Sequence, residues 1–139
     1  MAVVTFENGA VATIEGTVNV YPKNLEETLY LFGEKGTVKL GGKATNNIDV
    51  WQFSDQNDQD SVLEGKQEVI SNLYGNGHTR LYSDMLEAIR DDRPPLISGQ
   101  EGTKALEIVL AIYKSYLTNQ SVRLPLEQFA STDMTGIFK

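Results

Sequence analysis

The chain has 139 residues, of which 40% are hydrophobic and 22% charged, the size and composition of one globular domain. Its 12 lysines and arginines against 19 aspartates and glutamates give a net charge of -7, the wrong sign for a nucleic-acid or anionic-membrane partner. The sequence contains no cysteine and one histidine, which excludes disulfides, iron–sulfur clusters, thiolate zinc sites and metal sites built on two or three histidines.

The opening of the chain has the pattern of a β-hairpin. Residues 2–7 and 10–20 flank Asn8-Gly9, a pair that tolerates the positive φ angles of a two-residue type I′ turn. If this turn sets the register, the hairpin has two partly apolar faces. One face then carries Val4, Phe6, Val11 and Thr13, and the other carries Val3, Thr5, Ala12 and Ile14.

Three further strands are predicted. Residues 25–32 and 37–40 pair around the turn Gly33-Glu34-Lys35-Gly36, and residues 48–53 form the next strand. Residues 55–60 are polar and aperiodic, which indicates a solvated loop. Because these strands are apolar on both faces, helices covering one face would leave the second exposed. We therefore expect a homodimer formed through the open sheet face.

Two amphipathic helices follow. Apolar residues recur at one-face spacing until Asp91-Asp92-Arg93-Pro94-Pro95 ends the pattern, which predicts a helix over residues 78–90. The second helix begins at Ser98, three residues before Glu101 in a capping-box spacing, and runs to about Thr118. Its predicted buried face comprises Ala105, Leu106, Val109, Leu110, Tyr113, Tyr116 and Leu117.

The end of the chain completes the fold prediction. Asn119 is placed to cap the second helix, residues 122–125 have the pattern of a short strand, and residues 127–139 are predicted to be irregular. Strands followed by helices, without βαβ alternation, predict the α+β class. The expected architecture is a mostly antiparallel (mixed) open β-sheet with helices packed on one face.

The motifs of common catalytic and cofactor sites are absent. The nearest approach to a dinucleotide fingerprint is residues 75–80, Gly-Asn-Gly-His-Thr-Arg, in which Arg80 stands where a small residue should pack. We therefore expect no Rossmann domain in this chain. This segment nevertheless lies at the start of a predicted helix, where free backbone N–H groups attract anions. Two interpretations of its polar residues remain. Either His78 or Thr79 caps the helix, or His78 and Arg80 contact a ligand.

No signal for export or membrane insertion is visible. Residues 1–6 have neither a basic region nor a long apolar one, and no apolar run approaches the roughly 18 residues that span a bilayer. We expect a cytoplasmic protein.

The helical half nevertheless resembles a known family. The resemblance is carried by residues 75–89 (GNGHTRLYSDMLEAI), 99–115 (GQEGTKALEIVLAIYKS) and 122–125 (VRLP), and more loosely by 6–10 (FENGA) and 31–38 (LFGEKGTV). Over residues 1–126 the chain resembles the C-terminal end of the Gfo/Idh/MocA oxidoreductases, nearest their nucleotide-sugar dehydrogenase branch.

This resemblance implies a two-domain parent enzyme acting on a sugar or nucleotide sugar. Its N-terminal Rossmann domain would hold NAD or NADP and carry the lysine of a Glu-Lys-Pro motif, and residues 1–126 would be part of the C-terminal substrate-binding and oligomerisation domain, with 127–139 as a tail. The family's catalytic lysine, aspartate and histidine have no counterpart here, so we expect no catalytic, cofactor-binding or metal-binding residue in this chain and no activity of the chain alone. The resemblance makes His78 the one expected substrate contact. The alternative is a free-standing, dimeric, non-catalytic binding module.

Overall fold

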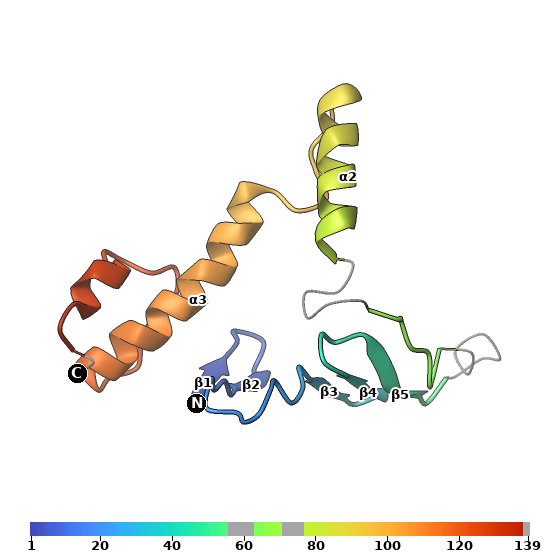
Figure 1. The fold of residues 1–139 in the computed structure, drawn as a ribbon. Coiled ribbons are helices and arrows are strands. Elements are labelled where there is room, and N and C mark those ends of the chain that lie inside the picture. The colour runs from blue at the N-terminus through green and yellow to red at the C-terminus, as the bar shows by residue number, and fades with distance from the viewer. Residues whose placement is uncertain (56–62, 71–76, 138–139) are drawn as a thin grey trace. The chain divides into compact units, whose positions relative to one another are not determined.

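The computed structural model of the chain describes residues 1–55, 63–70 and 77–137. Its elements, in chain order, are β1 (Ala2–Thr5), β2 (Val11–Ile14), β3 (Leu29–Gly33), β4 (Gly36–Gly41), β5 (Asn47–Phe53), α2 (Gly77–Arg90), α3 (Gly99–Thr118) and the 3₁₀ helix η1 (Ser131–Met134) (Figure 1). The α+β class is confirmed. Among the described residues the strands form two antiparallel sheets, β1-β2 and β3-β4-β5, where the sequence had suggested one.

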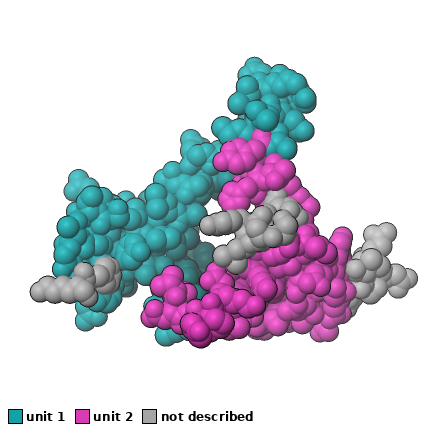
Figure 2. Space-filling view, in the orientation of Figure 1, with its two compact units in different colours: residues 1–15, 83–139 teal, residues 16–82 magenta. Residues whose placement is uncertain are grey.

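The chain divides into two compact units (Figure 2). Unit 1 contains residues 1–15 and 83–139, and unit 2 contains residues 16–82. The boundary falls inside α2, after Tyr82, so the first turns of that helix belong to the unit that holds the three-stranded sheet.

The β1-β2 hairpin forms where predicted, but its turn differs from the predicted type. Gly9 N–H donates to the Phe6 carbonyl at 2.9 Å, and Phe6 N–H donates to the Ala10 carbonyl at 2.9 Å, which leaves three residues in the loop. The Asn8 side-chain oxygen accepts from Ala10 N–H at 3.0 Å, and Gly9 has a φ of 86°. A three-residue loop that ends in a left-handed glycine is the next most common hairpin connection after the type I′ turn.

This turn shifts the register by one residue, so the predicted hairpin faces were wrong. Val4 lies opposite Ala12, where the two-residue turn would have placed it opposite Thr13. One face therefore carries Ala2, Val4, Ala12 and Ile14, and the other carries Val3, Thr5, Val11 and Thr13. The strands are also shorter than the predicted 2–7 and 10–20.

The β3-β4 hairpin follows the prediction closely. Gly33 pairs with Gly36, so Glu34 and Lys35 form a two-residue loop. Residues 25–28 were predicted as strand but precede β3, because β4 ends at Gly41 and leaves them no strand to pair with. Glu27 N–H still donates to the Gly42 carbonyl at 2.9 Å.

A β-bulge interrupts the pairing of β4 with β5. Lys39 lies opposite Val50 and Leu40 lies opposite Ile48, so Asp49 is an extra residue between the two pairs. Its carboxylate lies 2.9 Å from the Lys39 ammonium.

The register gives the three-stranded sheet two distinct faces. The face that we call the apolar face carries Leu29, Leu31, Val38, Leu40, Ile48, Trp51 and Phe53. The opposite face, which we call the aromatic face, carries Tyr30, Phe32, Thr37, Lys39, Asp49, Val50 and Gln52. Val38, at the centre of the apolar face, is buried, whereas all of β3 is exposed.

Both predicted helices form at the expected positions. Ser98 is the N-cap of α3, and its hydroxyl accepts from Glu101 N–H at 3.3 Å. Asn119 ends α3 in the left-handed conformation, with a φ of 54°, as predicted. In α2, Ala88 is the buried residue, and Asp84 accepts from Arg93 at 2.8 Å and from Leu96 N–H at 2.6 Å just beyond the helix.

The apolar stripes of the two helices are present but exposed, contrary to the expectation that they are buried. The exposed residues are Leu81, Tyr82, Met85, Leu86 and Ile89 in α2, and Leu106, Val109, Tyr113, Tyr116 and Leu117 in α3. Residues 108 and 110–112 of α3 are half-buried, so this helix is apolar around most of its circumference. Such a helix requires apolar neighbours on more than one side.

The end of the chain differs from both predictions made for it. Residues 122–125 form no strand, and the chain there is tied to α3 by side chains: Ser115 donates to the Gln120 carbonyl at 2.7 Å, and Lys114 donates to the Glu127 carbonyl at 2.8 Å. Within the tail, Ser131–Met134 form η1, whose Asp133 carboxylate accepts from Ala130 N–H at 2.9 Å. Met134 is buried, and η1 contacts α3, so the first part of the tail is structured.

Candidate functional site

His78 lies in the first turn of α2 and is exposed. Gly75 and Asn76, which the sequence placed in the same candidate segment, lie outside the described residues. Arg80, the second residue proposed to donate hydrogen bonds to a ligand, follows Thr79 in α2. Its guanidinium lies 3.3 Å from a carboxylate oxygen of Glu68. Both partners of this ion pair are substantially exposed, so the pair itself stabilises the fold little.

The segment that carries Glu68 is fixed to the edge of β5. Gly65 N–H donates to the Ile48 carbonyl at 2.7 Å, and Ile48 N–H donates to the Lys66 carbonyl at 2.8 Å. Next along the chain, Asn46 and Glu68 bind reciprocally: Glu68 N–H donates to the Asn46 carbonyl at 2.8 Å, and the Asn46 side-chain amide donates to the Glu68 carbonyl at 2.9 Å.

Asn46 is itself held by the turn that precedes β5. Its side-chain oxygen accepts from Ala44 N–H at 3.3 Å, and Gly42, with a φ of 92°, leaves the space into which this oxygen fits. A side chain at Gly42 would collide with Asn46, so this glycine is required for both its conformation and its size.

Asn46, Glu68 and Arg80 thus form a connected polar group beside the helix start that carries His78. We call these four residues the α2-start cluster. Three separate segments of unit 2 contribute to it, and its members offer an amide, a carboxylate, a guanidinium and an imidazole. These groups can donate to and accept from the hydroxyl groups of a polyol, whereas no group of three or more potential metal ligands occurs in the described part of the chain.

The sequence pattern pointed to His78 and Arg80 but not to Asn46 and Glu68. The pairing of Glu68 with Arg80 spans 12 residues, and that of Asn46 with Glu68 spans 22. No local motif links such positions, so only the folded chain shows them together.

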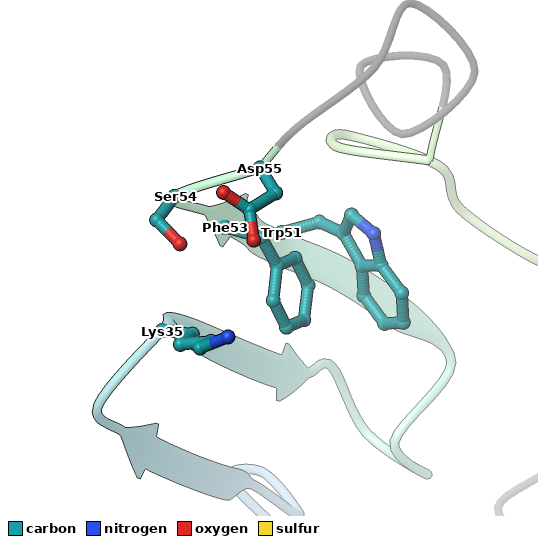
Figure 3. A pocket seen from close by; sticks show the side chains of 5 residues that line it. All are labelled: Lys35, Trp51, Phe53, Ser54 and Asp55. Atoms are coloured by element: carbon teal, nitrogen blue, oxygen red, sulfur yellow. The ribbon is translucent and has the colours of Figure 1, made fainter.

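A second candidate is a shallow hollow of about 350 Å³ at the end of the β3-β4 hairpin, lined by Lys35, Trp51, Phe53, Ser54 and Asp55 (Figure 3). Trp51 and Phe53 extend from the same side of β5 and meet edge to face, with ring centroids 5.4 Å apart. Ser54 N–H donates to the Lys35 carbonyl at 2.8 Å and closes the hairpin end against β5. Trp51 and Phe53, which line the hollow, lie on the apolar face of the sheet. The hollow is therefore an extension of the apolar face.

Lys39 and Asp84 are among the described ionisable groups whose pKa values are shifted. The hydrogen bond to Asp49, together with the negative charge of the same carboxylate, raises the pKa of Lys39, so the ion pair on the aromatic face persists at neutral pH. The Leu96 N–H and then the Arg93 guanidinium lower the pKa of Asp84. Asp84 thereby keeps its charge while it fixes the chain that leaves α2.

These observations define an α+β domain with a polar cluster at a helix start and, in its sequence, none of the motifs that bind a dinucleotide. The family model described as the oxidoreductase family, C-terminal alpha/beta domain, matches residues 1–124. The chain therefore belongs to the Gfo/Idh/MocA oxidoreductase family, and the family predicted from its sequence is confirmed. No curated protein matches the chain.

Two solved structures are similar to the chain along most of its length. One is the WlbA dehydrogenase from Bordetella pertussis in complex with NADH and UDP-GlcNAcA, with 33% identity and a TM-score of 0.74 over 90% of this chain and 34% of that one. The other is the WlbA dehydrogenase from Chromobacterium violaceum in complex with the same two molecules, with 34% identity and a TM-score of 0.74 over 91% of this chain and 34% of that one. The chain thus spans about a third of the length of these dehydrogenases. In the part of it that the structure describes, no helix is long and apolar enough to cross a membrane.

Proposed function

We propose that the chain is the substrate-binding and oligomerisation part of an NAD(P)-dependent dehydrogenase that acts on a sugar or nucleotide sugar. The observation that carries this proposal is the similarity, over about nine tenths of the chain, to two dehydrogenases whose structures hold NADH and UDP-GlcNAcA. The cofactor and the catalytic lysine would come from a Rossmann domain of the parent enzyme. The chain alone would then be inactive.

Within this proposal, His78 contacts the substrate. Its position in the first turn of α2 leaves His78 exposed, and the other members of the α2-start cluster can also bind hydroxyl groups. An imidazole can donate one hydrogen bond and accept another, which suits a hydroxyl-rich ligand. Glu68 and Arg80 would define one wall of the same site.

Assembly is the second part of the proposed role. The three-stranded sheet has large apolar or aromatic side chains on both faces, and several of them are exposed, Phe32 by 79%. Exposed patches of this kind mark contact surfaces, and we propose that the parent enzyme is a homodimer, or a larger assembly built from dimers, joined through the sheet.

Kinetics of the complete parent enzyme test the substrate role. NADH formation from NAD and UDP-GlcNAcA is measured for the wild type, for His78→Ala and for Ser83→Ala, an exposed polar residue of the same helix outside the cluster. Loss of one substrate hydrogen bond lowers kcat/KM for the sugar by about 2- to 13-fold, from a cost of about 0.5–1.5 kcal/mol. KM for NAD and the Ser83→Ala enzyme should be unchanged.

Two results would contradict the proposal at different levels. If His78→Ala leaves kcat/KM unchanged, His78 serves only the helix start. If the complete protein oxidises no sugar or nucleotide sugar with either NAD or NADP, the dehydrogenase assignment fails and the non-catalytic binding module is the better description.

A further inference from the structure

We infer that Asn8, in the loop of the β1-β2 hairpin, is a site of spontaneous covalent modification by deamidation, and that opening of this hairpin sets the rate. The inference goes beyond the proposed dehydrogenase function and does not depend on it, because it concerns the hairpin of unit 1 alone. It rests on the Asn8-Gly9 dipeptide, on the exposure of the loop and on the hydrogen bonds that close the loop.

Deamidation is an intramolecular substitution at the side-chain amide of asparagine. The backbone nitrogen of Gly9 loses its proton to a base and attacks Cγ of Asn8, and ammonia leaves from the tetrahedral carbon as a succinimide ring closes. Water then opens the ring. Attack of water at Cγ gives an aspartate in place of Asn8, whereas attack at the main-chain carbonyl carbon gives an isoaspartate. Overall a water molecule is consumed and ammonia is released, and nothing is oxidised or reduced.

The loop offers the space that ring closure needs. Gly9 has no side chain beside the attacking nitrogen, and a Cβ atom built on it would meet nothing within 4 Å beyond its chain neighbours. Residues 5–10 are all exposed, so water and base reach both reacting groups. Glycine adopts positive and negative φ values with similar ease, so the φ of 86° at Gly9 can change as the ring forms.

The closed loop, however, holds both reacting groups in hydrogen bonds. Gly9 N–H donates to the Phe6 carbonyl at 2.9 Å, so the proton that must leave is bound to an acceptor. The Asn8 side-chain oxygen accepts from Ala10 N–H at 3.0 Å, which fixes the amide that is attacked. The reactive state is therefore the open loop. Opening two ordinary protein hydrogen bonds should make the reaction about 5- to 160-fold slower than in the unfolded chain.

The hairpin is of a kind that opens without global unfolding. In the described part of the chain, β1 and β2 pair only with each other, through four residue pairs. Val3 and Val11 lie on the same face and are each 64% exposed, so little apolar burial holds the strands together. An isolated two-stranded hairpin is marginally stable, and such elements open locally. Deamidation should therefore proceed in the folded protein.

The two products should affect the hairpin differently. An aspartate in place of Asn8 presents a carboxylate oxygen that can accept from Ala10 N–H as the amide oxygen does. An isoaspartate routes the main chain through its side-chain carbons and so adds a methylene group to the loop. Since the length of the loop sets the register of β1 against β2, the second product should weaken the pairing of the strands.

Peptide mapping by mass spectrometry tests the site and its rate. Deamidation at Asn8 is followed over time in the 139-residue chain, in buffer and in urea at the same mildly alkaline pH. The second Asn-Gly pair, at residues 76 and 77, falls on a different tryptic peptide, so the two are scored separately. In buffer, Asn8 should react measurably but about 5- to 160-fold more slowly than in urea.

Three variants test the mechanism. Asn8→Gln keeps an amide but would have to close a larger ring, so modification of this peptide should disappear. Thr13→Gly weakens β2 outside the loop and should accelerate the reaction at Asn8 by about 2- to 5-fold, because the rate follows the population of the open hairpin. Glu15→Gly is the matched control just beyond β2 and should leave the rate unchanged.

Four results would overturn the inference. Equal rates in buffer and in urea would show that the loop does not control the reaction, and conversion in urea alone would show that the hairpin stays closed in the folded chain. Persistent modification of the Asn8→Gln peptide would place the reaction elsewhere. Equal effects of Thr13→Gly and Glu15→Gly would exclude hairpin opening as the step that sets the rate. These measurements use neither NAD nor a sugar, so their failure is distinguishable from failure of the proposed dehydrogenase function.

Discussion

Replacing Gly36 by alanine tests how tightly β4 and β5 pack at the end of the β3-β4 hairpin. A Cβ atom built at Gly36 would collide with the Phe53 ring and lie 2.7 Å from the Gln52 carbonyl oxygen. The ring can rotate away, but the oxygen belongs to the backbone of β5 and moves only if the paired strands shift. Overpacking of this kind costs about 1–3 kcal/mol. For a chain of this length we expect the melting temperature to fall by about 3–10 °C.

Gly33→Ala is the matched control, because Gly33 pairs directly with Gly36 across the hairpin. Its added Cβ would meet only the Gly36 carbonyl oxygen, at an ordinary distance of 3.6 Å. Gly33→Ala should be neutral or raise stability by about 0.4–1 kcal/mol, since alanine restricts the unfolded chain. Thermal and urea unfolding followed by circular dichroism, at equal protein concentration, compare the two variants. Equal stabilities would refute the packing argument.

A double variant separates the two collisions. Phe53→Ala removes the ring but leaves the Gln52 carbonyl in place. Adding Gly36→Ala to Phe53→Ala should therefore cost less than Gly36→Ala costs in the wild type, but still more than zero. Strict additivity would show that the ring plays no part in excluding a side chain at Gly36.

Three further predictions concern the helices and the cofactor. Ser98→Ala removes the acceptor of Glu101 N–H and should cost about 1 kcal/mol in unfolding free energy, whereas Ser98→Asp keeps the cap and should stay near the wild type; equal losses in urea titrations would exclude the cap as the cause. Leu96 N–H and Arg93 lower the pKa of Asp84, so the stabilising contribution of its carboxylate is complete above the ordinary pKa of 3.8 and disappears as the pH falls through the lowered pKa. The difference in unfolding free energy between wild type and Asp84→Asn should therefore shrink between pH 5 and strongly acidic pH. A constant difference would contradict this account. The 139-residue chain should bind neither NAD nor NADP in calorimetric titrations, because its sequence lacks the glycine-rich phosphate cradle, and micromolar binding of either would refute this expectation.

The elements that the sequence predicted best are those whose signals are local. Ser98 and Glu101 mark the start of α3, and Asn119 marks its end in the left-handed conformation. The glycines that flank Glu34-Lys35 likewise define the β3-β4 hairpin within one short stretch. In each case a few neighbouring residues satisfy or restrict the backbone by themselves, so no distant contact was needed for the prediction.

The first hairpin shows where local signals are insufficient. Asn-Gly is compatible with a two-residue turn and with a three-residue loop, and the hydrogen bond from Ala10 N–H to the Asn8 side chain accompanies the second. The two choices differ by one residue in register and exchange the faces of β2 relative to β1. A periodic pattern likewise identifies the apolar side of α2, but not what covers it.

The candidate site was predictable only in part. His78 was proposed from its place at a helix start and from the family resemblance, and Arg80 from its charge beside it. The remaining members of the α2-start cluster, Asn46 and Glu68, come from segments that the loops of unit 2 bring together. Their approach depends on backbone hydrogen bonds to the edge of β5, which no spacing rule encodes.

The extra residue at Asp49 also governs which changes of length the sheet can accept. Removing Asp49 would leave Ile48 opposite Leu40 and Val50 opposite Lys39, so every other side chain of β5 would keep its side of the sheet. Removing one residue between Val50 and Phe53 would instead invert the strand beyond that point and place Trp51 or Phe53 on the wrong side. Relatives that are one residue shorter in this region should therefore carry their gap at Asp49. A sequence alignment that places the gap elsewhere in β5 would align positions of the apolar face with positions of the aromatic face.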